Sequence, residues 1–71
     1  MGKLRPVQGR KLIKVLCNHY GFRAVRQKGS HVTLSDGTVY VTVPAKEIKV
    51  GLLSVILKDC GISQDEFLNK F

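Results

Sequence analysis

The strongest constraint on the fold of this chain is an Asp-Gly pair between two stretches that have the pattern of strands. Asp36 and Gly37 separate residues 32–35 from residues 38–43, and both stretches alternate apolar and polar side chains. Such alternation is typical of a strand with one buried face. Asp-Gly at this place is typical of a two-residue hairpin loop, because both loop positions need a positive φ. The sequence therefore predicts an antiparallel hairpin.

A two-residue loop would also fix the register of the hairpin. Ser35 would face Thr38, and His31 would face Thr42. The apolar face of the pair would be formed by Val32, Leu34, Val39, Val41 and Val43. The polar face would be formed by His31, Thr33, Ser35, Tyr40 and Thr42. Because residues that face each other share one side of a sheet, we expect His31 to point away from the core.

Amphipathic helices are predicted on either side of the strands. Residues 8–20 place apolar side chains at helical spacing, and residues 52–60 do the same before a closing glycine. Residues 22–27 have β character and lead through a turn at residues 28–30 into the hairpin, so they are expected to form a further strand. Residues 45–50 are expected to form a short polar loop. Gly9 is expected to reduce the stability of the first helix slightly, at the start of that helix.

A short third helix is expected near the end of the chain. Ser63 and Glu66 have the spacing of a capping box, and Ile62 can pack on Phe67 as a hydrophobic staple. The predicted fold is α+β, in the order α-β-β-β-α. It has a three-stranded antiparallel sheet, two helices on one face and a short C-terminal helix, and is similar to the double-stranded-RNA-binding fold. A chain of 71 residues is expected to form one domain over residues 1–71.

Positive charge is concentrated in the first half of the chain. Residues 1–35 hold eight Lys and Arg residues and no acid, whereas residues 36–71 hold four lysines and five acids. The net charge of +7 therefore comes entirely from the half that leads to His31. A field of this kind attracts polyanions, so RNA is an expected partner.

The composition also makes several classes of protein unexpected. No apolar run approaches the roughly 18 residues that span a bilayer, and the start of the chain lacks the hydrophobic region of a secretory signal. We therefore expect a cytoplasmic protein with no membrane partner. Cys17 and Cys60 are expected to pack in the core, and their spacing from His19 and His31 does not suggest a zinc site. No metal and no small-molecule cofactor is expected.

A short motif, Gly29-Ser30-His31, opens the predicted second strand. It occurs together with Gly21-Phe22 after the first helix, Val41-Thr42-Val43-Pro44 at the end of the third strand, and residues 46–63, which contain a lysine-rich loop, a glycine and a leucine-rich helix. In this order and spacing the motifs resemble the HicA family of toxin endoribonucleases. The resemblance covers nearly the whole chain.

The resemblance implies an activity, a site residue and a partner. His31 would occupy the position of the family's catalytic histidine, members cleave mRNA without a metal, and a HicB-type antitoxin protein holds each member inactive. RNA cleavage of this kind needs a base, an acid and positive groups around the phosphate, and histidine exchanges protons near neutral pH. We therefore interpret the chain as a metal-independent endoribonuclease that cleaves mRNA, with His31 as general acid/base.

The residues just before His31 are candidates for RNA binding. Arg26 and Lys28 can contact phosphate or remain solvated surface charges. Gly29 lets the backbone approach a phosphate or supplies a turn with positive φ, and the sequence supports the two alternatives equally. Ser30 can bind phosphate, but capping of the turn is favoured.

A second group of candidates for RNA binding lies on one side of the first helix, and consists of Arg10, Lys11 and Lys14. No acid on the helix offsets these charges, which favours contact with RNA or with an acidic partner. Tyr40 on the polar face can stack on a base, although a cross-strand pair with Thr33 is favoured.

Two other functions stay open at the level of sequence. A non-catalytic RNA-binding module of the same fold would use His31 only as a polar surface residue. A basic structural subunit of a ribonucleoprotein also fits the charge, but it leaves the Gly29-Ser30-His31 motif without a role.

Overall fold

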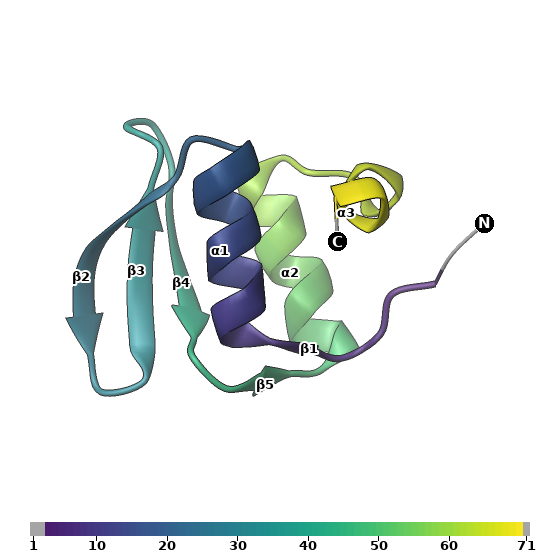
Figure 1. The fold of residues 1–71 in the computed structure, drawn as a ribbon, viewed down its shortest axis with the longest axis horizontal. Helices are drawn as coiled ribbons and strands as arrows, with labels where there is room; N and C mark the ends of the chain where they lie inside the picture. Colours follow the sequence, from purple (N-terminus) through teal and green to yellow (C-terminus); the bar gives the residue numbers. More distant parts are fainter. Residues whose placement is uncertain (1–2, 71) are drawn as a thin grey trace.

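The structure, a computed structural model, describes residues 3–70. Its elements follow in the order β1 (Val7–Gln8), α1 (Gly9–His19), β2 (Arg23–Lys28), β3 (His31–Ser35), β4 (Tyr40–Pro44), β5 (Glu47–Ile48), α2 (Val50–Cys60) and α3 (Gln64–Lys70). β2, β3 and β4 form an antiparallel sheet with β3 in the centre, and β1 pairs with β5 in a separate ladder (Figure 1). The predicted α+β fold with a three-stranded antiparallel sheet is confirmed.

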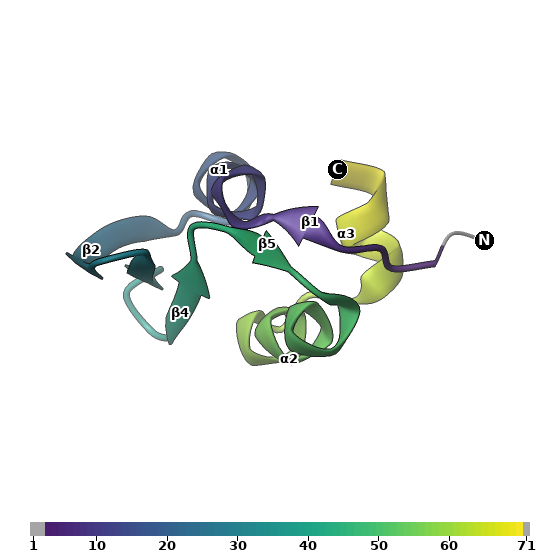
Figure 2. The same cartoon turned by 90° about the horizontal axis from the view of Figure 1, so that it is seen from below.

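One hydrophobic core joins the helices to the sheet. α1 and α2 both contact β4, and Figure 2 shows the two helices on either side of the β1–β5 ladder. The buried apolar side chains alternate along β3 and β4, as expected for a sheet with one covered face. The core consists of Leu12, Leu16, Phe22, Val32, Leu34, Val41, Val43, Ile48, Leu53, Ile56, Leu57, Ile62 and Phe67.

The β3–β4 hairpin is present, but its predicted register is wrong by two residues. Ser35 pairs with Tyr40, and His31 pairs with Pro44 and not with Thr42. The loop therefore holds four residues, 36–39, where the sequence analysis expected two. A shift of two residues preserves the alternation of faces, so the apolar residues of both strands still point to the core. His31 is exposed, as predicted.

Side-chain hydrogen bonds explain the longer loop. One carboxylate oxygen of Asp36, Oδ1, accepts the N–H groups of Thr38 and Val39, both at 2.8 Å. The hydroxyl of Ser35 accepts the N–H of Gly37 at 3.0 Å. Asp and Ser side chains compete with strand ladders in this way, because they offer the backbone an alternative partner. The Asp-Gly pair thus forms part of a wider turn.

The segment predicted as a polar loop, residues 45–50, contains β5. Val7 pairs with Ile48, and Gln8 pairs with Glu47. Ile48 is buried in the core. Strands of two residues leave no alternation to detect, so this ladder could not be predicted from local pattern.

The start of α1 lies against this ladder, and Gly9 is required there. The N–H of Gly9 donates to the carbonyl of Lys46 at 2.8 Å, whereas the side chain of the N-cap residue Gln8 forms no capping bond. A Cβ on Gly9 would overlap the carbonyl oxygen of Pro44 and lie 2.8 Å from that of Lys46. The expectation that this glycine slightly destabilises the helix is therefore corrected, because no side chain fits at this position.

The C-terminal part of the fold follows the prediction. α2 ends just before Gly61, and the hydroxyl of Ser63 accepts the N–H of Glu66 at 3.1 Å at the start of α3. Ile62 and Phe67 are both buried, as a hydrophobic staple requires. Both cysteines are free and half-buried beside the core, and desolvation raises the pKa of Cys60 to about 11.

The close approach at Gly9 gives a stability prediction. Gly9→Ala forces Cβ into the backbone of Pro44, and we expect the free energy of unfolding to fall by about 1–3 kcal/mol, the usual cost of an overpacked site. Gly51→Ala in α2 is the matched control. A Cβ there meets no atom within 4 Å, and alanine should stabilise the helix by up to about 1 kcal/mol. Urea denaturation measures both; equal stability of the two variants would contradict the analysis.

The Asp36 turn gives a pH prediction. Hydrogen bonds from the Val39 and Thr38 N–H groups lower the pKa of Asp36 below its ordinary value of 3.8. A carboxylate whose pKa is lower in the folded state stabilises the fold above its unfolded pKa, and that contribution is lost as pH falls through the folded pKa. Asp36→Asn should therefore be less stable than the parent at pH 7, and the difference should vanish in acid. Urea denaturation as a function of pH tests this, with Asp59→Asn as the control for removal of a surface charge.

Candidate functional site

The face of the sheet turned away from the helices, here called the open face, carries the predicted catalytic histidine. Residues that pair across an antiparallel ladder share one side of the sheet. Besides the buried Ser35 and Pro44, the observed registers therefore place seven residues on the open face: Arg23, Arg26, Lys28, His31, Thr33, Tyr40 and Thr42. All of them except the half-buried Thr33 are exposed. The open face thus combines one imidazole, three cations, two threonines and one aromatic ring.

A β-bulge in β2 determines which cations reach the open face. Ala24 pairs with Leu34 and Arg26 pairs with Thr33, so Val25 is an extra residue without a partner. Without the bulge, strict alternation from Arg23 would turn Arg26 and Lys28 toward the helices. With it, all three cations lie on one side. The bulge has no signal in the local sequence, so the side on which Arg26 and Lys28 lie could not be predicted.

A tight turn holds the start of β3. Gly29 has a φ of +61°, so a conformation that favours glycine accounts for this residue. The side-chain amide of Gln27 donates to the Gly29 carbonyl at 3.0 Å. The carbonyl of Ser30 accepts the N–H of Ala45 at 2.6 Å. The turn is thus fixed to β2 on one side and to the end of β4 on the other.

The turn places His31 directly opposite Lys28. The two residues form the last pair of the β2–β3 ladder, and such pairs have Cβ atoms about 5 Å apart. Arg26 lies further along the same side of β2. The structure therefore brings together the predicted residues of this segment: Arg26, Lys28, Gly29, Ser30 and His31. An exposed imidazole beside a cation can move a proton next to a bound anion.

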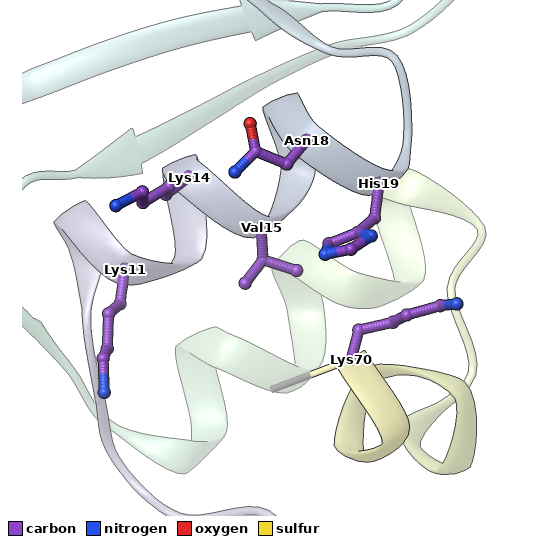
Figure 3. A pocket seen from close by; sticks show the side chains of 6 residues that line it. All are labelled: Lys11, Lys14, Val15, Asn18, His19 and Lys70. Atoms are coloured by element: carbon purple, nitrogen blue, oxygen red, sulfur yellow. The ribbon is translucent and has the colours of Figure 1, made fainter.

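The predicted RNA-binding lysines of α1 lie on a different surface. Lys11 and Lys14 line an open hollow together with Val15, Asn18, His19 and Lys70, which come from α1 and α3 (Figure 3). Arg10, in the first turn of α1, is also exposed. Because α1 covers the buried face of the sheet, this hollow and the open face lie on opposite sides of the sheet. The predicted site residues thus form two basic surfaces.

The open face also corrects the favoured interpretation of Tyr40. Its cross-strand neighbour is Ser35, and Thr33 instead pairs with Thr42, with the two hydroxyl oxygens 3.4 Å apart. Tyr40 therefore has no large partner across the hairpin, and 69% of its surface is exposed.

The described residues contain neither a metal-binding cluster nor a helix that spans a membrane. Within residues 3–70, no three His, Cys, Asp or Glu side chains are grouped so that they could hold a metal ion. In the same part of the chain, no helix has both the length and the apolar character needed to cross a membrane.

Comparison with known proteins identifies the family. A family model described as the HicA toxin of bacterial toxin-antitoxin matches residues 9–62. No curated protein and no solved structure matches the chain. The matched segment begins at the first residue of α1 and ends after α2, so it contains every strand of the open face and both helices that support it. Since this match spans most of the 71 residues, the chain belongs to the HicA family of toxins from bacterial toxin–antitoxin systems.

Proposed function

We propose that this protein is an endoribonuclease toxin that cleaves mRNA without a metal, with His31 as general acid/base. The observation that carries the proposal is the pairing of an exposed histidine with Lys28 at the end of a face that also holds Arg26. Family membership supports the role of a toxin. The net charge of +7 supports a polyanionic substrate.

The proposed reaction is attack by a ribose 2′-hydroxyl on the adjacent phosphorus. The new bond joins the 2′-oxygen to phosphorus, and the bond to the 5′-oxygen breaks, which leaves a cyclic phosphate and a 5′-hydroxyl. His31 takes the 2′-hydroxyl proton as a base or donates a proton to the leaving oxygen as an acid. Lys28 and Arg26 stabilise the negative charge that builds on the phosphate oxygens.

The proposed partners follow from the two basic surfaces. RNA binds the open face through Lys28, Arg26 and the backbone of Gly29 and Ser30. Arg10, Lys11 and Lys14 form a separate surface that binds more distant phosphates of a long RNA. A HicB-type antitoxin neutralises the protein in the cytoplasm by covering the open face with acidic groups, because complementary charge directs such complexes. An exposed site of this kind can be inhibited by coverage alone.

The first test of the proposal compares the two histidines of the chain. His31→Ala removes an exposed side chain and no core contact, so folding should change little. Cleavage of RNA and inhibition of growth should both be lost, with a fall in rate of about 100-fold or more, the usual contribution of a general acid or base. RNA affinity should change only slightly. His19→Ala, which removes the exposed histidine at the end of α1, is the control and should cleave like the parent.

Further measurements distinguish this proposal from a non-catalytic RNA-binding module. Parent protein should cleave in the presence of a chelator, and its products should end in a cyclic phosphate. A folded His31→Ala protein that cleaves as fast as the parent would show that the histidine mechanism is wrong. Binding without any cleavage by the parent would favour the binding module.

The salt dependence of RNA affinity tests the role of the open-face cations. The logarithm of affinity should fall linearly with the logarithm of salt concentration, and Lys28→Gln should reduce the slope by about 0.7, the effect of one phosphate contact with single-stranded nucleic acid. Lys58→Gln removes a lysine from the last turn of α2 and should leave the slope unchanged. Equal slopes for parent and Lys28→Gln would exclude Lys28 from the phosphate contacts.

A further inference from the structure

We infer that the open face binds unpaired RNA, with one nucleobase stacked on Tyr40 in a hollow at the opposite end of the face from His31. The inference rests on the proposed function and deepens it by naming the substrate class and a residue that recognises it. It starts from the exposed ring of Tyr40, which neither the core nor the proposed chemistry uses.

The hollow has the composition of a site for a flat, partly polar ring. Tyr40 and Val25 line it with side chains that are 69% and 54% exposed. The bulge leaves Val25 unpaired, so this apolar side chain lies beside the open face. The remaining lining residues are Gly21, Arg23, Ser35, Asp36 and Gly37. Stacking on an aromatic ring, with Arg nearby, is the way in which proteins hold single nucleobases.

Small residues make room for the base. Ser35 lies opposite Tyr40 and has its hydroxyl turned to the N–H of Gly37, so it does not cover the ring. The carboxylate of Asp36 is held at the rim by the N–H groups of Thr38 and Val39, which also lower its pKa and keep it ionised at neutral pH. This carboxylate can accept a hydrogen bond from an amino group on a base edge.

A row of cations connects the hollow with His31. Arg23 pairs with Ser35 beside the hollow, Arg26 lies beside Thr33, and Lys28 lies beside His31. Ser35 and His31 are four positions apart along β3, which corresponds to about 13 Å along a strand. At about 3.4 Å per nucleotide of a stacked strand, this length suits up to about four nucleotides. One short RNA segment can thus place a base on Tyr40 and a phosphate at His31.

The arrangement selects against a regular duplex. Bases within an A-form helix are stacked on their neighbours and present no face to a protein side chain, whereas bases in loops and single strands are free to stack on aromatic rings. Tyr40 lies on the open face, and the lysines of α1 lie on the other side of the sheet. The open face therefore favours unpaired RNA, although the order of the elements resembles that of the double-stranded-RNA-binding fold.

The chain permits a direct optical test. It has two tyrosines and no tryptophan, so Tyr20→Phe leaves Tyr40 as the only emitter of tyrosine fluorescence. Tyr20→Phe keeps the packed ring and removes only a buried hydroxyl, which lies near the carboxylate of Glu66 without a well-formed hydrogen bond, so the protein should remain folded. The Tyr20→Phe, His31→Ala protein is titrated with an unstructured ten-nucleotide RNA and with the same RNA annealed to its complement. We expect strong quenching by the single strand and little by the duplex.

Substitutions separate stacking from simple burial of apolar surface. In the His31→Ala protein, Tyr40→Phe should bind the single strand like its parent, whereas Tyr40→Leu and Tyr40→Ala should bind about 5- to 100-fold more weakly, the usual effect of losing one stacked base. Val55→Ala removes an apolar side chain of α2 that is 54% exposed, and this variant should bind normally. An abasic nucleotide should abolish the difference in RNA affinity between the His31→Ala protein and its Tyr40→Ala variant. It should do so only when it stands at the one position of the strand whose base stacks on Tyr40.

Each possible result either supports or overturns the inference. Quenching by duplex as strong as by single strand, or equal affinity of Tyr40→Ala and its parent, would overturn it. Quenching by the antitoxin but not by RNA would show that the hollow docks a protein, and would also overturn it. These results are independent of the proposed function. Cleavage that depends on His31 can persist even if no base stacks on Tyr40. Conversely, a His31→Ala protein that still cleaves would overturn the proposed mechanism and leave the quenching of Tyr40 unchanged.

Discussion

The open face depends on the contact between the first residue of α1 and the backbone that follows β4. Pro44 pairs with His31, Ala45 donates to the carbonyl of Ser30, and Lys46 accepts the N–H of Gly9. Three successive residues thus join the strand that begins with His31, the turn before it and the start of a helix. Only glycine permits this approach. In a chain of 71 residues, where the core is small, such backbone bonds add to side-chain packing in holding the site.

Much of the fold is predictable because its main signals are periodic. Alternation in the hairpin identified the buried face, and it remained valid although the register was wrong, because an error of two residues does not exchange the faces. The capping residues Ser63 and Glu66 identified α3 for a similar reason, since a hydrogen bond between neighbours is encoded by their spacing. The loop length was not predictable from the Asp-Gly pair, because the side chains of Ser35 and Asp36 stabilise a longer turn.

The candidate site is less predictable, because long-range contacts determine it. His31 was found from its motif and from the resemblance, and alternation alone predicted its exposure. The side on which Arg26 and Lys28 lie depends on the bulge at Val25, and a bulge is a property of two strands together. The separation of Lys11 and Lys14 from His31 likewise requires knowing which face of the sheet α1 covers. Charge clusters in a sequence do not show which cations will share a surface.

The site and the core use separate residues, and this separation has a consequence for regulation. His31, Lys28 and Tyr40 are exposed, so the open face can change without loss of the packing that keeps the domain folded. The same exposure leaves the site accessible to solvent, since no segment within residues 3–70 covers it. The proposed function therefore assigns control to an antitoxin. An antitoxin that neutralises Arg23, Arg26 and Lys28 would occupy the cations that the RNA phosphates need. Substrate and inhibitor would then exclude each other, because they compete for one surface. Such competition requires no change in the shape of the toxin.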